Sequence, residues 1–286
     1  MAHAQPSTAA TRASAIDGAS RQRELERIAA TRGRYHAVSL LLLRPGTSGY
    51  EPRVTTPSTS PSPIGVVCDF DGTATLLDIG DEVSRHFGGI AFWEERSAAF
   101  RRGELTTRQI IEAIYQKVTA GEPEVQAYAV SVARLRPGFA PLIEACRARG
   151  APFILASGGL RQYIEPVLAA HLPAAARAHV LIRANEAIFA PPPLRVTFPG
   201  DEESRRLGCS VCGSCKRVAV AELRAAGVRH VIGIGDGFAD RCLAEKVDAV
   251  FAREGSFLQR HCVERGLPHT PFTTLDGAAE AVAAFR

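Results

Sequence analysis

Apolar and polar residues alternate in a regular way from Ile64 onward. Short apolar runs are separated by longer stretches in which apolar residues recur at helical spacing. The runs that predict strands cover residues 64–69, 152–156, 180–183, 230–235 and 248–252. The stretches that predict helices cover residues 139–149, 160–171, 215–226, 239–246 and 255–265. Alternation of this kind is typical of a parallel sheet with helices on both faces, so the pattern predicts an α/β fold.

Two parts of the chain depart from this rhythm. Residues 79–135 contain three or four helical segments and no convincing strand, which predicts a helical insert after the first strand. Residues 1–63 are rich in Ser, Thr, Ala, Arg and Pro, which predicts a disordered or low-complexity tail. The expected organisation is therefore a tail (1–63), a core (64–78 and 136–286) and a helical insert (79–135).

Charge and composition narrow the range of partners. The net charge is +4, but the tail alone holds eight Arg and four acidic residues, so the body is neutral and no nucleic-acid partner is expected. The longest apolar run of the tail, AVSLLLL, is far shorter than the roughly 20 residues that cross a membrane, so no membrane segment is expected. Seven cysteines without a secretory signal predict reduced thiols and a cytoplasmic protein. The Arg- and Ser-rich tail leaves organelle targeting as the alternative.

The chemistry-bearing residues follow the predicted strands. DFDGT follows the first strand, SGG the second and GDGFAD the fourth, and the carboxyl ends of parallel strands share one edge of a sheet. This brings the carboxylates of Asp69, Asp71 and Asp236 together. Clustered carboxylates repel one another unless a cation joins them, and oxygen ligands suit Mg²⁺. We therefore expect a magnesium site that also receives a phosphate group.

Hydrolysis of a phosphate monoester requires a nucleophile, a proton donor for the leaving oxygen and groups that hold the phosphoryl oxygens. Asp69 is the candidate nucleophile, and Asp71 is the candidate acid and base. The candidate phosphate-binding groups are the Ser157 hydroxyl, the amides before the next helix and one cation: Ser157, Gly158, Gly159 and Lys216.

This set of motifs, in this order, resembles the haloacid dehalogenase (HAD) superfamily of aspartate-nucleophile phosphatases. The resemblance covers residues 64–286 and implies a Rossmann-like parallel sheet with a small helical cap inserted after the first strand. It implies that Asp69 forms an aspartyl-phosphate, that Asp236 and the main-chain carbonyl of Asp71 bind the metal, and that Asp240 positions Lys216 or the metal-bound waters.

The insert resembles the cap of the phosphoserine-phosphatase-like branch, and CSVCGSCK (209–216) resembles the MtnX-like phosphatases of methionine salvage. The expected substrate is a small phosphorylated metabolite, and an enol phosphate of the methionine salvage pathway is the first choice. Phosphoserine and phosphocholine or phosphoethanolamine are the alternatives. The position that holds the substrate amine in phosphoserine phosphatases is Asp78 here, which makes Asp78 a candidate specificity residue. Trp93 and Phe100 are interpreted as packing residues of the insert.

The three cysteines before Lys216 allow two interpretations. Cys209, Cys212 and Cys215 have the spacing of a zinc site but no obvious fourth ligand, or they are reduced thiols that order a loop. Two other classes of protein stay open, a non-catalytic HAD-like binding module and a redox protein built on the cysteine cluster. A monomer or a homodimer is expected.

Overall fold

The computed structural model describes residues 62–286. The predicted tail, residues 1–63, lies outside the described residues apart from its last two. Among the described residues, none of the helices has both the length and the apolar character needed to span a bilayer.

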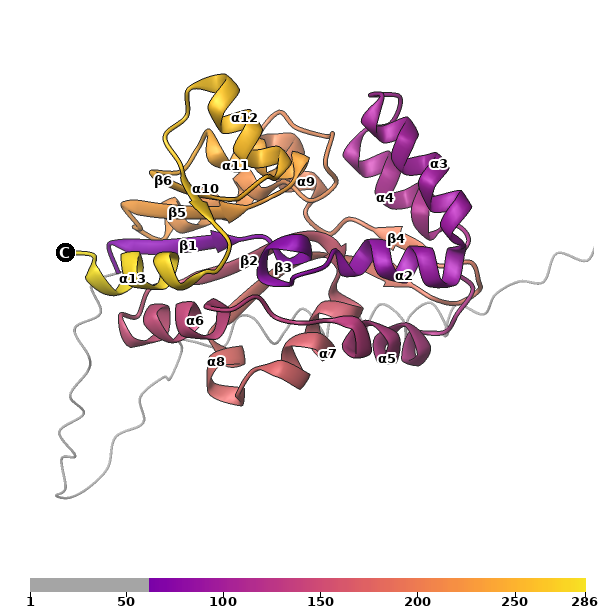
Figure 1. Cartoon of the computed structure of the whole chain (residues 1–286), viewed down its shortest axis with the longest axis horizontal. Coiled ribbons are helices and arrows are strands. Elements are labelled where there is room, and N and C mark those ends of the chain that lie inside the picture. The colour runs from indigo at the N-terminus through magenta and orange to yellow at the C-terminus, as the bar shows by residue number, and fades with distance from the viewer. Residues whose placement is uncertain (1–61) are drawn as a thin grey trace, which may run out of the picture. The chain divides into compact units, whose positions relative to one another are not determined.

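A seven-stranded sheet forms the centre of the described part, in the order β4-β3-β2-β1-β5-β6-β7 (Figure 1). All neighbouring strands are parallel except β3 and β4, which are antiparallel. The strands are β1 (Ile64–Cys68), β2 (Phe153–Leu160), β3 (Val180–Ile188), β4 (Arg195–Thr197), β5 (His230–Gly235), β6 (Ala249–Arg253) and β7 (Thr270–Phe272). The predicted α/β fold is confirmed.

Each predicted strand exists, and the differences concern the lengths of two strands and two short strands at the edges of the sheet. β2 and β3 continue beyond the predicted ends, and the short strands β4 and β7 were not predicted. Each of these two strands has only three residues, which is too short for a periodic signal. β7 also contains Pro271, a residue that sheets accept mainly at their edges.

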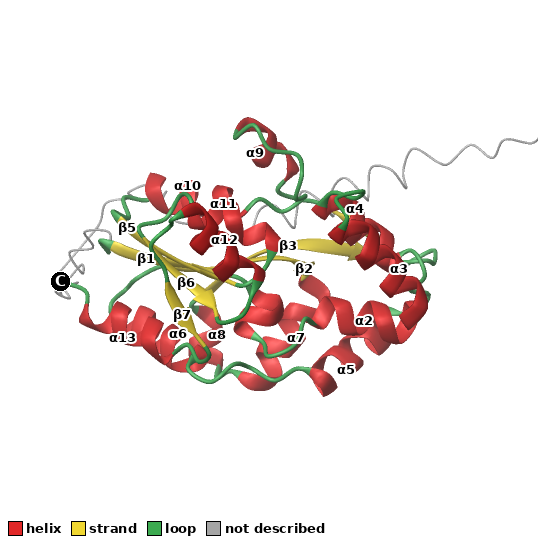
Figure 2. Ribbon diagram, turned by 45° about the horizontal axis from the view of Figure 1, so that its top comes forward, coloured by secondary structure: helices red, strands yellow, loops and turns green. Residues whose placement is uncertain are grey.

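Helices cover both faces of the sheet (Figures 1 and 2). One face carries α6 (Phe139–Ala148), α7 (Arg161–His171), α8 (Ala174–Ala178) and α13 (Asp276–Ala284). The other face carries α10 (Lys216–Ala225), α11 (Arg241–Ala244) and α12 (Phe257–Arg265), while α9 (Asp201–Arg206) lies in the loop before α10. β1 is buried along its whole length, which explains why its sequence, IGVVC, is apolar without alternation.

Four helices fill the insert: α2 (Ile79–Gly88), α3 (Ile90–Arg101), α4 (Thr107–Tyr115) and α5 (Glu122–Val132). They lie beyond the carboxyl end of β1 (Figure 1). The two ends of the insert meet in a bridge between Thr75 and Leu135, where Leu76 N also donates to Arg134 O at 2.9 Å. The exact domain boundaries at residues 79 and 135 stay a prediction.

Candidate active site

The strand order places three of the sequence motifs side by side. β1 lies between β2 and β5, so Asp69, Ser157 and Asp236 follow three neighbouring strands at the same edge of the sheet. A cavity of about 420 Å³ opens at this edge. Its floor includes Asp69, Asp71, Lys216 and Asp236, and its upper wall comes from the insert.

Asp69 begins the turn Phe70–Ala74 that follows β1. Its Oδ1 accepts from Phe70 N at 2.7 Å, and its Oδ2 lies 2.8 Å from Lys216 Nζ. Both oxygens of this nearly buried carboxylate are therefore held in place. Burial and then the neighbouring Asp240 raise the pKa of Asp69 well above its ordinary value, against the opposing effect of Lys216.

Asp71 accepts four hydrogen bonds from three parts of the fold. Its Oδ1 accepts from Ile79 N (3.0 Å) and Gly80 N (3.3 Å) in the first turn of α2. Its Oδ2 accepts from Ser157 Oγ (3.1 Å) and Tyr163 OH (3.0 Å). Burial raises the pKa of Asp71 to about 6, although these hydrogen bonds favour the charged form. A carboxyl group with a pKa near neutrality suits proton transfer.

Lys216 is the first residue of α10, and its side chain is buried between two carboxylates. Nζ contacts Asp69 Oδ2 and Asp240 Oδ1. Asp240 is fully buried, and its other oxygen accepts from Asp236 N (3.0 Å) and Gly237 N (2.8 Å). Burial works against the charged form of Lys216, but Asp240 and Asp69 outweigh it and raise the lysine pKa. Lys216 is thus a fixed positive charge beside Asp69.

Asp236 is held from two sides. Its Oδ1 accepts from Thr73 Oγ1 at 3.0 Å, and its Oδ2 accepts from Arg253 Nε at 3.1 Å and Nη2 at 2.8 Å. Burial and then Asp240 raise the pKa of Asp236, while Arg253 opposes this effect. Burial is thus the main cause of the elevated pKa of both Asp69 and Asp236, and the neighbouring carboxylate of Asp240 adds to it.

A metal ion fits this cluster. Asp69, Asp236 and Asp240 each offer a carboxylate oxygen, and these three atoms lie within 4.8 Å of one another. The side chain of Asp71, in contrast, points toward Ser157 and Tyr163. The side chain of Asp71 is therefore not part of this cluster, and the main-chain carbonyl of Asp71 as a metal ligand stays a prediction.

The SGG motif differs from the predicted loop before a helix. Ser157, Gly158 and Gly159 belong to the end of β2, where the register with β3 shifts between Ala156 and Leu160. Gly159 N donates to Ser157 Oγ at 2.8 Å, and Asn185 Nδ2 donates to Gly158 O at 2.7 Å. A Cβ atom on Gly159 would lie only 1.9 Å from Tyr163 OH and 2.5 Å from Asp71 Oδ2, so the close packing around the acid requires glycine here.

The wall that the insert contributes to the cavity extends one interpretation: Trp93 packs against the hydrophobic core, as expected, and also faces the cavity. Trp93 and Phe100, which we expected to pack inside the insert, both line the cavity. Trp93 Nε1 donates to Asp81 Oδ1 at 2.7 Å, and the Phe100 ring contacts the Phe238 ring at a centroid distance of 5.5 Å. Asp78 also lines the cavity, and its Oδ1 caps α2 by accepting from Asp81 N at 2.8 Å.

The family was established by comparison with known proteins. The model of the haloacid dehalogenase-like hydrolases matches residues 66–245, which is more than half of the chain. The chain belongs to the haloacid dehalogenase-like hydrolases. It is a HAD-type phosphatase, and the predicted resemblance to the MtnX-like branch is confirmed.

A curated relative, the 2-hydroxy-3-keto-5-methylthiopentenyl-1-phosphate phosphatase of Geobacillus thermodenitrificans, is 30% identical over 209 residues, which cover 72% of this chain and 90% of the relative. A HAD family hydrolase from Salmonella enterica serovar Typhi has a similar fold, with a TM-score of 0.61, 16% identity and coverage of 79% of this chain and 73% of that chain. Phosphoserine phosphatase from T. onnurineus gives a TM-score of 0.52 at 19% identity, covering 80% of this chain and 100% of that chain.

The cysteines before Lys216 do not form a ready metal site. In residues 62–286 the group of His, Cys, Asp or Glu side chains close enough to share an ion is the aspartate cluster, and Cys209, Cys212 and Cys215 are not part of it. All three are free thiols. Burial and the neighbouring thiols raise the pKa of Cys212 to about 11, which keeps it protonated. A zinc site here stays a prediction without support from this geometry.

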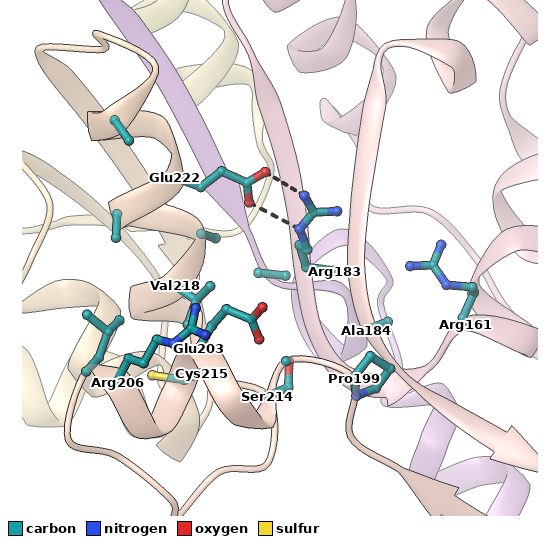
Figure 3. Close-up of a pocket in the computed structure, with 16 residues that line it drawn as sticks. Arg161, Arg183, Ala184, Pro199, Glu203, Arg206, Ser214, Cys215, Val218 and Glu222 are labelled. Carbon is teal, nitrogen blue, oxygen red and sulfur yellow. Dashed lines mark hydrogen bonds and ion pairs between the residues drawn. The ribbon is translucent and has the colours of Figure 1, made fainter. Parts of the chain in front are cut away.

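A second, larger cavity of about 660 Å³ lies beside α10 and β3 (Figure 3). Among its charged residues Arg183 pairs with Glu222, whereas Arg161 and Arg206 pair with Glu165 and Glu202, which do not line the cavity. It does not include Asp69, Asp71 or the aspartate cluster. The smaller cavity is therefore the candidate active site. The two cavities come close to each other in sequence, because Cys215 and Ala156, which line the larger one, precede Lys216 and Ser157.

Sequence reasoning missed three polar residues that contact the site. Tyr163 binds Asp71, while Thr73 and Arg253 bind Asp236. Thr73 lies within the DFDGT motif and Tyr163 lies four residues after SGG, but the sequence analysis assigned no role to either residue. Arg253 is the last residue of the strand AVFAR, and its place at the carboxyl end of a strand next to β5 was the available signal.

Proposed function

We propose that the protein is a Mg²⁺-dependent phosphomonoesterase that works through an aspartyl-phosphate on Asp69. The observation that carries this proposal is the juxtaposition of Asp69 and Asp71 with Lys216 on the floor of one cavity. One carboxylate is fixed by a lysine as a nucleophile requires, and the other has the elevated pKa that a proton donor requires.

The metal fits the carboxylate cluster. Asp69, Asp236 and the main-chain carbonyl of Asp71 would hold Mg²⁺, which when bound neutralises part of the charge on the carboxylates and the phosphoryl oxygens. Asp240 is already engaged by Lys216 and two amides, which favours a role in positioning the lysine.

In the first half-reaction an oxygen of Asp69 attacks phosphorus, and the bond from phosphorus to the leaving oxygen breaks. Asp71 gives its proton to that oxygen, so the product leaves as a neutral alcohol or enol. Lys216 and the Ser157 hydroxyl would stabilise the negative charge on the phosphoryl oxygens. In the second half-reaction Asp71 takes a proton from water, which attacks phosphorus and releases inorganic phosphate and the free carboxylate of Asp69.

The preferred substrate is 2-hydroxy-3-keto-5-methylthiopentenyl-1-phosphate. The name of the Geobacillus relative, which matches across 90% of its own length, supports this choice. The cavity also suits a small molecule with an apolar end, since Ile110, Ile111 and Phe100 line its upper wall.

A second candidate is a phosphorylated amino alcohol, such as phosphoserine, phosphoethanolamine or phosphocholine. Asp78 and Asp81 line the same wall as Trp93, and carboxylates beside an aromatic ring favour a cationic group. The two substrate classes therefore differ in the role of Asp78, because only a phosphorylated amino alcohol has a cationic group that its carboxylate could bind.

The direct test is a screen of small phosphomonoesters with Mg²⁺, using wild type and Asp69→Asn. We expect the substitution to lower kcat by roughly 10³-fold, because it removes the attacking charge and one metal ligand. Asp276→Asn, at an exposed acid of α13, is the control and should keep wild-type turnover. Phosphate release at the wild-type rate by Asp69→Asn would exclude Asp69 as the nucleophile.

We also propose a cytoplasmic location for this protein. All seven cysteines are free in the structure, which suits a reducing compartment. Fractionation of cells that express the full chain, with and without residues 1–61, tests this and the organelle alternative together.

A further inference from the structure

Arg136 occupies the point where the chain returns from the insert to the core. It follows Leu135, which pairs with Thr75, and it is buried, with 7% of its surface exposed. A buried guanidinium is costly unless its N–H groups are satisfied. The sequence LRPGF gives no sign of this burial, because an arginine before proline usually lies in solvent.

The guanidinium of Arg136 is satisfied by main-chain carbonyl oxygens. Nε donates to Thr73 O at 2.7 Å, and Nη2 donates to Gly72 O at 2.7 Å and Thr75 O at 3.2 Å. Nη1 donates to Thr273 O at 3.0 Å, before α13. In residues 62–286 Arg136 takes part in no ion pair, in contrast to Arg253 with Asp236.

The main chain of Arg136 completes the set. Its N–H donates to Ala74 O at 2.8 Å. Arg136 thereby binds the four successive carbonyl oxygens of residues 72–75, which directly follow Asp71. It does not bind Asp71 O, the carbonyl that the proposed metal site uses.

This turn needs an external partner because it is not a regular helix. Asp71 has extended backbone angles (φ −68°, ψ 122°), and Gly72 has φ 70°. Carbonyl oxygens that a helix would pair with its own N–H groups therefore need other donors, and an unpaired buried carbonyl costs about 1–3 kcal/mol. One planar, five-donor side chain supplies them, which lysine with its point charge does not reproduce.

We propose that Arg136 is a positioning residue, which fixes the turn so that the Asp71 side chain points to the leaving oxygen and its carbonyl to the metal. This rests on the proposed function, since the roles of Asp71 are those assigned above. Arg136 itself does not line the cavity. Its effect is transmitted through the backbone of residues 72–75.

The experiment compares Arg136→Gln and Arg136→Lys with a matched control, Arg149→Gln. Arg149 also donates to two carbonyl oxygens, those of Ala283 and Phe285, but it lies at the C-terminal end of the fold, away from the cavity. Three quantities are measured with p-nitrophenyl phosphate as substrate: kcat and KM, the Mg²⁺ dissociation constant without substrate by calorimetry, and Tm.

We expect Arg136→Gln to lower kcat by about 10²-fold, the effect of a shift of about 1 Å in a catalytic group. KM should change by less than about threefold, because Lys216 and Ser157 remain, while Mg²⁺ binds more weakly. Arg136→Lys should lie between wild type and Arg136→Gln. Free guanidinium ion, well below denaturing concentrations, should restore part of the kcat of Arg136→Ala.

The control separates positioning from general stability. If Arg149→Gln lowers Tm as much as Arg136→Gln and kcat falls equally in both, Arg136 has only a structural role and the proposal is wrong. A folded Arg136→Gln with wild-type kcat and Mg²⁺ affinity also overturns it. If Arg136→Gln does not fold, Arg136→Lys decides, and wild-type kcat and Mg²⁺ affinity in that variant would overturn the proposal. Failure of the wild type to hydrolyse any phosphomonoester would refute the proposed function instead.

Discussion

Two adjacent glycines should respond very differently to the same added methyl group. In Gly159→Ala the new Cβ would lie 1.9 Å from Tyr163 OH and 2.5 Å from Asp71 Oδ2. In Gly158→Ala the nearest atom is Ile111 Cδ1 at 3.4 Å, an ordinary contact. Both glycines are candidates for phosphate binding. Comparison of the two variants therefore distinguishes steric crowding of Asp71 from a general effect of an added methyl group on the SGG segment.

The magnitude follows from these distances. A carbon and an oxygen atom rest at about 3.3 Å or more, so Asp71 Oδ2 must move by roughly 0.8 Å and the Tyr163 hydroxyl by more. A misplacement of about 1 Å in a catalytic group costs about 10²-fold, or about 2.7 kcal/mol of transition-state stabilisation. Overpacking of this kind also lowers the free energy of unfolding by about 1–3 kcal/mol.

The assay is kcat and KM for p-nitrophenyl phosphate, with Tm from thermal unfolding. We expect Gly159→Ala to lose about 10²-fold in kcat and several degrees in Tm, whereas Gly158→Ala should stay within about threefold of wild type. Adding Tyr163→Phe to Gly159→Ala removes the closest clash and should recover part of the Tm. It should recover little activity, because the contact with Asp71 Oδ2 remains. Equal losses from both single variants, or none from Gly159→Ala, would refute the reasoning.

Two further predictions concern the metal and the insert. Removal of divalent cations with EDTA should abolish turnover but leave the fold intact, because the carboxylates keep their contacts with Lys216 and Arg253. Circular dichroism checks the fold, and restoration of turnover by added Mg²⁺ checks the role of the metal. Asp78→Ala should change kcat/KM for substrates with an amine or hydroxyl group more than for p-nitrophenyl phosphate; equal proportional losses would assign Asp78 to the fold or the common chemistry.

The core of the fold and the approximate place of the site could be predicted because their signals are local. The apolar run 64–68 predicts a buried strand, and the acids that follow it predict what the strand end carries. The carboxyl ends of parallel strands share one edge of a sheet, which predicts that the motifs meet there, whereas the order of the strands was not predicted. The predicted roles of Asp69, Asp71, Asp236 and Lys216 are compatible with the contacts that the structure describes, and they await the experiments above.

The remaining residues of the site could not be predicted because their partners are distant in sequence. Tyr163 contacts Asp71 across 92 positions, and Arg136 contacts Thr73 across 63. Such a pair leaves no periodic pattern in the sequence, because each residue on its own is typical of a helix or a loop. Trp93 shows the related difficulty on the insert: a large apolar residue is read as core, and only the tertiary arrangement gives it a cavity to face.

The hydrogen bonds of Asp71 connect elements of the core and of the insert that are distant in sequence. The core supplies Ser157 and Tyr163 to one oxygen, and the first turn of α2 supplies Ile79 N and Gly80 N to the other. A displacement of α2 would therefore remove two of the four hydrogen bonds that orient the acid. In the proposed mechanism the insert, which lines the cavity, would thus also set the geometry of proton transfer, because its first helix begins eight residues after Asp71 and donates hydrogen bonds to it.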